Sequence, residues 1–338
     1  MPHREALLER TPQGLYCPRG DFHIDPWRPV ERAVITHAHA DHARGGSRHY
    51  LAAAPSGAIL RHRLGQKMSL QLLDYAEPLN LNGVQVSLYP AGHILGSTQV
   101  RIEADGQVWV ISGDYKTEGD ATCAPFEPLA CHTFVTESTF GLPVFNWQPQ
   151  HTVLAAINHW WQANRDLGRT SLLFAYALGK SQRVLAGLDP AIGPIFTHGA
   201  VEAVNACYRQ QEITLPVTMP VNSVDDPRRF EGAMVIAPPS ANTGAWTKRF
   251  KRVSRAFASG WMHIRGHRRR RSVDRGFVLS DHCDWPGLNR AIAETGAETV
   301  WVTHGYAQEL VRWLKDQGCD AHVVEPRLDG DRTDQDIA

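Results

Sequence analysis

The stretch Thr36-His37-Ala38-His39-Ala40-Asp41-His42 places four potential metal ligands within six residues, directly after the apolar run Ala33-Val34-Ile35. We therefore predict a buried strand that ends here and presents its ligands in the turn beyond. His37 and His39 alternate and can face one metal ion, while Asp41 and His42 can face a second. Imidazole and carboxylate ligands suit zinc, manganese or iron better than calcium. The alternative is a polar loop rich in histidine, which the further ligand candidates downstream argue against.

The same order, an apolar strand followed by a ligand-type side chain, recurs along the chain. Strand-like segments precede the side chains of His93, Asp114, Glu137, His282 and His304. A single His or Asp at a strand end is usually structural, but the repetition favours a shared metal site.

Asp25 stands before Pro26, which fixes a turn. Its position alone supports two interpretations equally. The carboxylate either braces the histidine loop from behind the ligands or caps the turn.

Composition limits the class of protein. The chain has 338 residues, with 35 Lys+Arg and 35 Asp+Glu, so its length allows one large or two medium domains and its net charge is near zero. Neutral charge makes no general case for nucleic-acid binding, which must depend on local patches. The six cysteines are scattered without a C-x-x-C pair, which favours a reducing compartment. No signal core or membrane-length apolar run is present, so we expect a cytoplasmic protein with no membrane partner.

Two segments before residue 150 have clear local patterns. Leu and Met recur at roughly helical spacing between residues 61 and 74, which predicts a surface helix. Residues 100–104 and 107–111 predict a hairpin that turns at Asp105-Gly106. From residue 151 to about 255, strands and helices alternate, which predicts a separate unit with a small parallel sheet.

Gly179-Lys180-Ser181 suggests a phosphate-binding P-loop, but that motif needs a glycine at position 174, where Phe174 stands. We therefore exclude nucleotide hydrolysis. Lys180 at the start of a helix is either a phosphate contact or a solvated lysine.

One concentrated basic patch lies between residues 256 and 276. It contains Trp261 and the arginines Arg265, Arg268, Arg269, Arg270 and Arg271. Basic side chains with aromatic neighbours are suited to gripping a phosphodiester backbone. A solvated basic loop is the alternative.

These motifs resemble those of the metallo-β-lactamase-fold nucleases of the β-CASP group, and more narrowly the bacterial exonucleases encoded beside an ATP-dependent DNA ligase and a helicase. The H-x-H-x-D-H motif matches at His37, His39, Asp41 and His42, and the later motifs match at His93, Asp114, Glu137, His282 and His304. The resemblance implies an α/β protein. An αββα sandwich would be built from residues 1–145 and 259–338, with residues 146–258 as an inserted cap. Many relatives have Ala before the histidine of the penultimate motif, whereas this chain has Asp281, a second candidate for support behind the site.

The resemblance also implies a two-metal mechanism. His37, His39 and His93 would hold one ion, Asp41, His42 and His304 the other, and Asp114 would bridge them. The ions, Mn²⁺ or Zn²⁺ with Mn²⁺ favoured for activity, would activate a bridging hydroxide that attacks phosphorus. The catalytic residues would be Asp41, His282 as phosphate contact and proton donor to the leaving oxygen, and Glu137 orienting it. Cys283 invites a thiol-nucleophile mechanism, which the metal site makes unnecessary.

Four functions compete at this point. The first is a DNA exonuclease acting at 5′ ends in repair, with a functional link to a DNA ligase and a helicase. The second is a ribonuclease in RNA processing, which remains open because no residue is identified as a reader of the ribose 2′-hydroxyl. The third is a small-molecule hydrolase such as a lactonase or glyoxalase, which would lack a cap between Glu137 and His282 and would not need the arginine run. The fourth, a non-catalytic nucleic-acid scaffold, predicts broken metal motifs.

Overall fold

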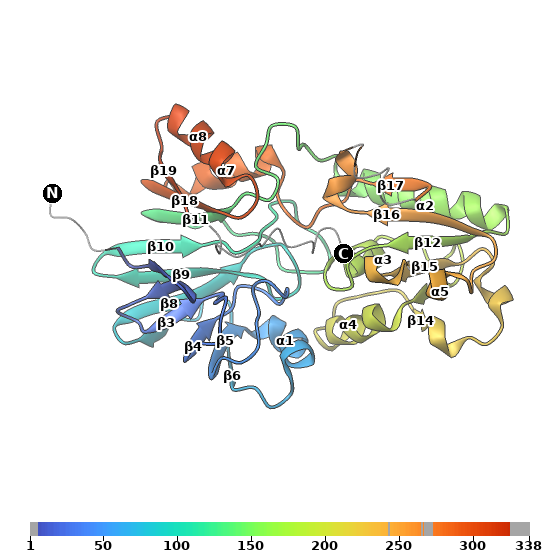
Figure 1. Cartoon of the computed structure of the whole chain (residues 1–338), viewed down its shortest axis with the longest axis horizontal. Coiled ribbons are helices and arrows are strands. Elements are labelled where there is room, and N and C mark those ends of the chain that lie inside the picture. The colour runs from blue at the N-terminus through green and yellow to red at the C-terminus, as the bar shows by residue number, and fades with distance from the viewer. Residues whose placement is uncertain (1–5, 243, 265, 267–272, 325–338) are drawn as a thin grey trace. The chain divides into compact units, whose positions relative to one another are not determined.

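The computed structural model of the protein describes residues 6–242, 244–264, 266 and 273–324. These residues form a mixed α/β structure with three β-sheets, shown in Figure 1. They divide into two compact units. The first unit combines the residues up to Asn146 with those from His282 onward, and the second comprises Trp147–Asp281.

The first unit contains two sheets. In spatial order, the first sheet consists of β1 (Glu9–Thr11), β2 (Gly14–Cys17), β3 (Phe22–Ile24), β4 (Arg32–Val34), β5 (His49–Ala53) and β6 (Leu70–Leu73). The second consists of β19 (Asp320–Val323), β18 (Thr299–Thr303), β11 (Thr133–Glu137), β10 (Gln107–Ile111), β9 (Thr98–Ala104), β8 (Val84–Pro90) and β7 (Leu79–Leu81). The strands of the second sheet therefore come from two parts of the sequence, one before and one after the second unit.

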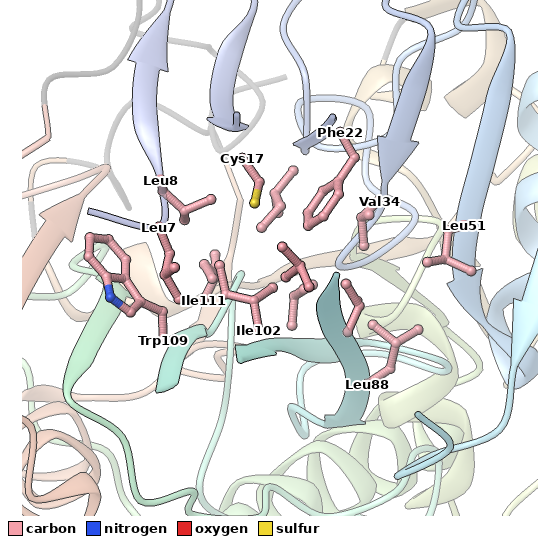
Figure 2. Close-up of a cluster of buried hydrophobic side chains, with 14 of the residues drawn as sticks. Leu7, Leu8, Cys17, Phe22, Val34, Leu51, Leu88, Ile102, Trp109 and Ile111 are labelled. Carbon is pink, nitrogen blue, oxygen red and sulfur yellow. The ribbon is translucent and has the colours of Figure 1, made fainter. Parts of the chain in front are cut away.

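The two sheets pack face to face on one apolar core. Phe22 and Val34 from the first sheet meet Leu88, Ile102 and other residues of the second, as Figure 2 shows. Side chains of a strand point alternately to the two faces of a sheet. In β11, Val135 accordingly enters this core, whereas its neighbour Phe134 belongs to a different cluster.

That different cluster covers the other face of the second sheet. The helices α7 (Trp285–Thr295) and α8 (Ala307–Asp316) bury an apolar stripe there, including Leu288 and Leu310 against Phe134. Helix, sheet and sheet thus form successive layers of the first unit.

The predicted hairpin is confirmed, since β9 and β10 pair antiparallel around Asp105 and Gly106, which both have positive φ angles. The predicted helix over residues 61–74 is wrong. The helix α1 spans Gly57–Leu64 and ends at Gly65, whose φ of +107° does not continue a helix. The following leucines form β6, which pairs parallel with β5. The four leucines in this stretch fit both the helical period and the strand period, and pairing with β5 makes the second half of the stretch a strand.

The second unit contains a parallel sheet, as predicted from its alternating elements. Its strands, in spatial order, are β14 (Met219–Pro220), β13 (Ile195–Thr197), β15 (Met234–Ala237), β12 (Thr170–Phe174), β16 (Val253–Ala258) and β17 (Arg275–Phe277). Its helices are α2 (Gln150–Asp166), α3 (Lys180–Ala186), α4 (Gly199–Gln210) and α5 (Gly244–Thr247). Residues of β12 and β15 are buried on both faces, as is usual for parallel sheets.

The boundary expected at residue 258 lies elsewhere. Residues 275–277 form β17, which pairs parallel with β16, so the second unit extends to Asp281. The sequence predicts a strand before His282 but does not show that this strand pairs with β16. Among the described residues, no helix is long and apolar enough to cross a membrane.

Candidate metal centre

The histidine loop lies at one edge of the first sheet. It begins directly after β4, and its first residue is fixed on two sides, since Thr98 N donates to Thr36 O over 2.8 Å and Thr36 N donates to an Asp25 carboxylate oxygen over 2.8 Å. Asp25 reaches this position because it follows β3, which runs parallel to β4. A guanidinium nitrogen of Arg63 on α1 also donates to the carbonyl of Ala38 inside the loop. The loop is therefore held by both backbone and side-chain contacts.

Three parallel strands of the second sheet bring further side chains to one edge. β10, β11 and β18 run parallel, so their carboxyl ends coincide. Asp114 follows β10, Glu137 ends β11 and His304 follows β18. The predicted order of strand then ligand thus places these residues at one sheet edge.

One group of possible metal ligands combines His37, His39, His93 and Asp114, whose ligand atoms all lie within 4.8 Å of one another. His39 Nδ1 lies 3.1 Å from His37 Nε2 and 3.0 Å from His93 Nε2. Asp114 Oδ2 lies 3.5 Å from His37 Nε2 and 3.8 Å from His93 Nε2. Three imidazole nitrogens and one carboxylate oxygen converge on a single point, which is a ligand set suited to a divalent transition metal.

A second group combines His37, Asp41 and His42. His42 Nε2 is buried without a hydrogen-bond partner and lies 3.5 Å from Asp114 Oδ2 and 3.7 Å from Asp41 Oδ2. Its other ring nitrogen, Nδ1, donates to Asp25 Oδ2 over 2.7 Å. A carboxylate behind a histidine fixes the tautomer in which the opposite nitrogen has a free lone pair. An orphaned nitrogen between two carboxylates fits a metal ion in this place.

The electrostatics of the cluster also suit a cation. Burial raises the pKa of Asp114 to about 7. Burial would raise the pKa of Asp41 as well, but His42 and the neighbouring histidines lower it to about 2. Burial would lower the pKa of His42, yet Asp114, Asp41 and Asp25 raise it well above its usual range. The buried carboxylates therefore attract positive charge, which a proton or a metal ion can supply.

Glu137 and His282 form a pair beside the first group. His282 Nδ1 lies 2.9 Å and 3.0 Å from the two Glu137 carboxylate oxygens, and Tyr115 N donates to Glu137 over 2.8 Å. Burial would raise the pKa of Glu137, but the positive charge of His282 and its hydrogen bonds lower it. The ionised carboxylate directs the ring so that Nε2 faces away from it. Asp114, Glu137 and His282 also bring three ligand-type atoms within 4.8 Å of one another.

His304 lies beside the second group rather than within it. Its ring centroid is 5.4 Å from that of His42, and both line one cavity with Asp25 and Asp41. His304 has a φ of +53°, which is uncommon for a residue with a side chain. The hydroxyl of Ser138 contacts the carbonyl of His304 and holds this turn in place.

The carboxylate of Asp281, predicted to support the metal ligands, contacts two basic side chains of the second unit. In the second unit, its carboxylate pairs with Lys180 Nζ at 3.3 Å and with a guanidinium nitrogen of Arg183 at 3.7 Å. Lys180 is only 4% exposed, so it is neither the solvated lysine nor the open phosphate contact that the sequence suggested. The cause is the buried carboxylate of Asp281, which lies about a hundred residues further along the chain.

The predicted phosphate contacts Arg265 and Arg268–Arg271 lie outside the described residues. Sequence reasoning also missed three residues that the structure places beside the candidate site residues: Arg63, Ser138 and Arg183. Each donates a hydrogen bond to a backbone carbonyl, and because every residue has a carbonyl, such a contact leaves no recognisable sequence motif.

No family model matches the chain. The chain is 29% identical over 313 residues to a probable DNA ligase of Opitutus terrae, a match that covers 92% of this chain and 30% of that protein. It is 32% identical over 126 residues to the endoribonuclease YSH1 of Yarrowia lipolytica, which covers 36% of this chain and 14% of that protein. The YSH1 of Saccharomyces cerevisiae is 30% identical over the same length. The chain therefore spans less than a third of the length of these curated relatives.

A solved structure also resembles the chain. The crystal structure of a protein of unknown function from Enterococcus faecalis V583 aligns with a TM-score of 0.59 at 10% identity, covering 88% of this chain and 79% of that one. This likeness concerns the fold alone. The chain is therefore similar in sequence to proteins named as nucleic-acid enzymes, and it contains a histidine–aspartate cluster that could hold a metal ion.

Proposed function

We propose that the protein is a metal-dependent phosphodiesterase of the β-CASP metallo-β-lactamase type, acting as a DNA exonuclease from 5′ ends in repair. The observation that carries the proposal is the convergence of His37, His39, His93 and Asp114 beside the paired Glu137 and His282. The first four can hold a cation, and the pair can move a proton. Hydrolysis of a phosphodiester needs both capacities.

The residues that would hold two divalent ions, Mn²⁺ or Zn²⁺, are those of the predicted set. His37, His39 and His93 form one side, Asp41, His42 and His304 the other, and Asp114 faces both, with Oδ2 within 3.8 Å of three histidine nitrogens. When bound, such ions supply Lewis acidity and lower the pKa of a coordinated water. The protein's own contribution is a rigid loop whose ligands are oriented in advance by Asp25.

His282 is proposed to contact the phosphate and to protonate the leaving oxygen. Glu137 holds its Nδ1, so Nε2 is the ring nitrogen proposed to meet the substrate, and the ring centroids of His282 and His93 are 4.7 Å apart. A carboxylate bound to one ring nitrogen stabilises the protonated imidazole and fixes its direction. Cys283 is a poor nucleophile, since burial raises the pKa of its thiol to about 12.

DNA is favoured over RNA by the similarity to a probable DNA ligase, which extends over 92% of this chain. Because only 30% of that protein is covered, the similarity supports a functional link to a ligase, with a helicase implied by resemblance, and not ligase activity in this chain. The second candidate, a ribonuclease, is favoured by the similarity to YSH1 endoribonucleases over 36% of the chain.

The test is a cleavage assay with the purified protein, Mn²⁺ and matched single-stranded DNA and RNA labelled at either end. His37→Ala and Asp114→Ala serve as metal-site blanks. Stepwise loss of DNA from the 5′ end, absent in both variants, is the expected result. Preferential cleavage of RNA would assign the protein to RNA processing, and undiminished cleavage by either variant would refute the proposed metal site.

A further inference from the structure

The main chain of Tyr115, directly after the proposed ligand Asp114, makes two contacts that the proposed chemistry does not explain. Tyr115 N donates to Glu137 Oε1 over 2.8 Å, and Tyr115 O accepts from Cys283 N over 2.9 Å. Glu137 holds the ring of His282, and Cys283 follows His282 in the chain. All five residues lie in the first unit. The two polar backbone groups of Tyr115 therefore hold the proposed proton donor through its carboxylate partner and through its own backbone.

The chain on either side of this residue includes or contacts the proposed metal ligands. Asp114 Oδ2 lies within 3.8 Å of three histidine nitrogens. Lys116 N donates over 3.0 Å to Ala91 O, two residues before His93. The backbones approach closely here, since a Cβ on Gly92 would collide with Lys116 O. One short stretch of chain thus connects the proposed metal ligands with the proposed proton donor.

A buried side chain fixes the main chain of Tyr115. The ring is fully buried and stacks on Phe126, with the two ring centroids 5.2 Å apart. The phenol oxygen lies 3.0 Å from Thr136 Oγ1, which itself donates to the carbonyl of Glu137 over 3.0 Å. Because the Thr136 hydroxyl has a single proton, it accepts the proton of the phenol. Two consecutive hydrogen bonds therefore lead from the phenol of Tyr115 to the backbone of Glu137.

We propose that Tyr115 is a positioning residue for His282, and that the bond between its hydroxyl and Thr136 fixes the direction of its peptide groups. This inference rests on the proposed function, in which His282 protonates the leaving oxygen. A phenylalanine would fill the same space, and a buried hydroxyl is costly unless it is hydrogen-bonded, so packing alone does not account for the phenol. A displacement of about 1 Å at a reacting group can reduce a rate about a hundredfold.

The hydroxyl pair, Tyr115 and Thr136, can be removed with little change of shape. Tyr115→Phe removes the phenol oxygen and Thr136→Val removes its partner. The double variant removes both hydroxyls, so neither is left buried and unpaired, which keeps the cost in stability small. Thr295→Val is the matched control, because Thr295 is 2% exposed and donates to Ile292 O over 2.7 Å in the same unit. Thermal unfolding verifies that each variant is folded.

The first measurement is amide hydrogen exchange by NMR, which does not depend on activity. The amide protons of Tyr115 and Cys283 report the two backbone contacts directly. We expect both to exchange about tenfold faster in the hydroxyl-pair variants and at the wild-type rate in Thr295→Val. The amide of Thr98, which donates to Thr36 O in the histidine loop over 2.8 Å, should not change. Unchanged exchange at both reporting amides, or equal acceleration at all three amides, would overturn the inference.

The second measurement compares two substrates with Mn²⁺. Single-stranded DNA releases a sugar oxygen that needs a proton, whereas bis-p-nitrophenyl phosphate releases p-nitrophenolate, which leaves without one. We expect kcat on DNA to fall about tenfold in the hydroxyl-pair variants, with KM and bound metal unchanged. On bis-p-nitrophenyl phosphate, kcat should stay within about twofold of the wild-type value, because little proton donation is needed.

A variant of the proton donor calibrates this comparison. His282→Ala should show the same selective loss on DNA, and to a larger extent. Equal falls on both substrates in the hydroxyl-pair variants, or a loss of bound metal, would overturn the inference, because the metal centre or the fold would then be at fault. A wild-type protein that cleaves neither substrate would refute the proposed function, and amide exchange would still decide whether Tyr115 holds the backbone beside His282.

Discussion

Replacing Asp25 with Asn tests whether the hydrogen bond between the Asp25 carboxylate and His42 Nδ1 sets the affinity for metal. The Asp25 carboxylate accepts three hydrogen bonds, from Thr36 N, from the Thr36 hydroxyl and from His42 Nδ1. Its side chain is only 15% exposed, so water does not readily replace these bonds. Asn has one acceptor oxygen in place of two. If that oxygen keeps Thr36 N, the amide NH₂ faces His42 Nδ1, and His42 must move its proton to Nε2 to avoid a clash of donors.

The proton then occupies the nitrogen that would bind the metal. We expect Asp25→Asn to weaken binding of Mn²⁺ or Zn²⁺ about 10–100-fold, which corresponds to about 1.4–2.8 kcal/mol. Competition with a chelating dye, with bound metal counted by mass spectrometry, measures the change. Asp21→Asn is the matched control, since Asp21 is exposed and contacts Tyr16 and Arg32 instead of the histidine loop. Unchanged affinity in folded Asp25→Asn would refute this account of the loop.

Three further results are expected. Gly305→Ala places a Cβ 2.3 Å from Ser138 O, so thermal unfolding should show that the free energy of unfolding falls by more than about 2 kcal/mol. Gly296 has a similar φ but open space around it, so Gly296→Ala should lose only about 1–2 kcal/mol, and equal losses would contradict the clash. Because burial raises the pKa of Asp114 to about 7, metal must displace a proton below that pH, and metal titrations should show affinity rising between about pH 6 and pH 8; a flat profile would exclude this titration. Cys283→Ala should keep kcat within about twofold, and loss of cleavage in a folded variant would reopen a thiol mechanism.

The candidate site was largely predictable because its signals are local. The spacing of His37, His39 and His42 lies within one turn of chain, and each later ligand candidate follows its own apolar strand. Parallel strands then bring Asp114, Glu137 and His304 to one edge without any information beyond strand order. The geometry supports the predicted grouping around Asp114, while the metal-binding roles themselves remain proposals.

The features that sequence did not predict depend on partners far along the chain. Arg183 and the carbonyl of Ser280 are 97 residues apart, and nothing near either one indicates the other. The same limit explains Lys180, whose burial depends on Asp281, and the boundary at Asp281, which depends on the pairing of β17 with β16. Long-range pairing also decided between helix and strand for Leu70–Leu73.

The interrupted first unit has a consequence for the order in which a new chain gains its parts. β11 and β18 are neighbours in the second sheet, yet the whole second unit is synthesised between them. A nascent or truncated chain that stops before residue 282 has His37, His39, His93 and Asp114 but lacks His282, α7, α8 and β18. The proposed metal ligands are therefore synthesised before the proposed proton donor His282 and before His304, which lines one cavity with His42. We expect any fragment of this kind to cleave nothing, because it lacks His282, the proposed proton donor.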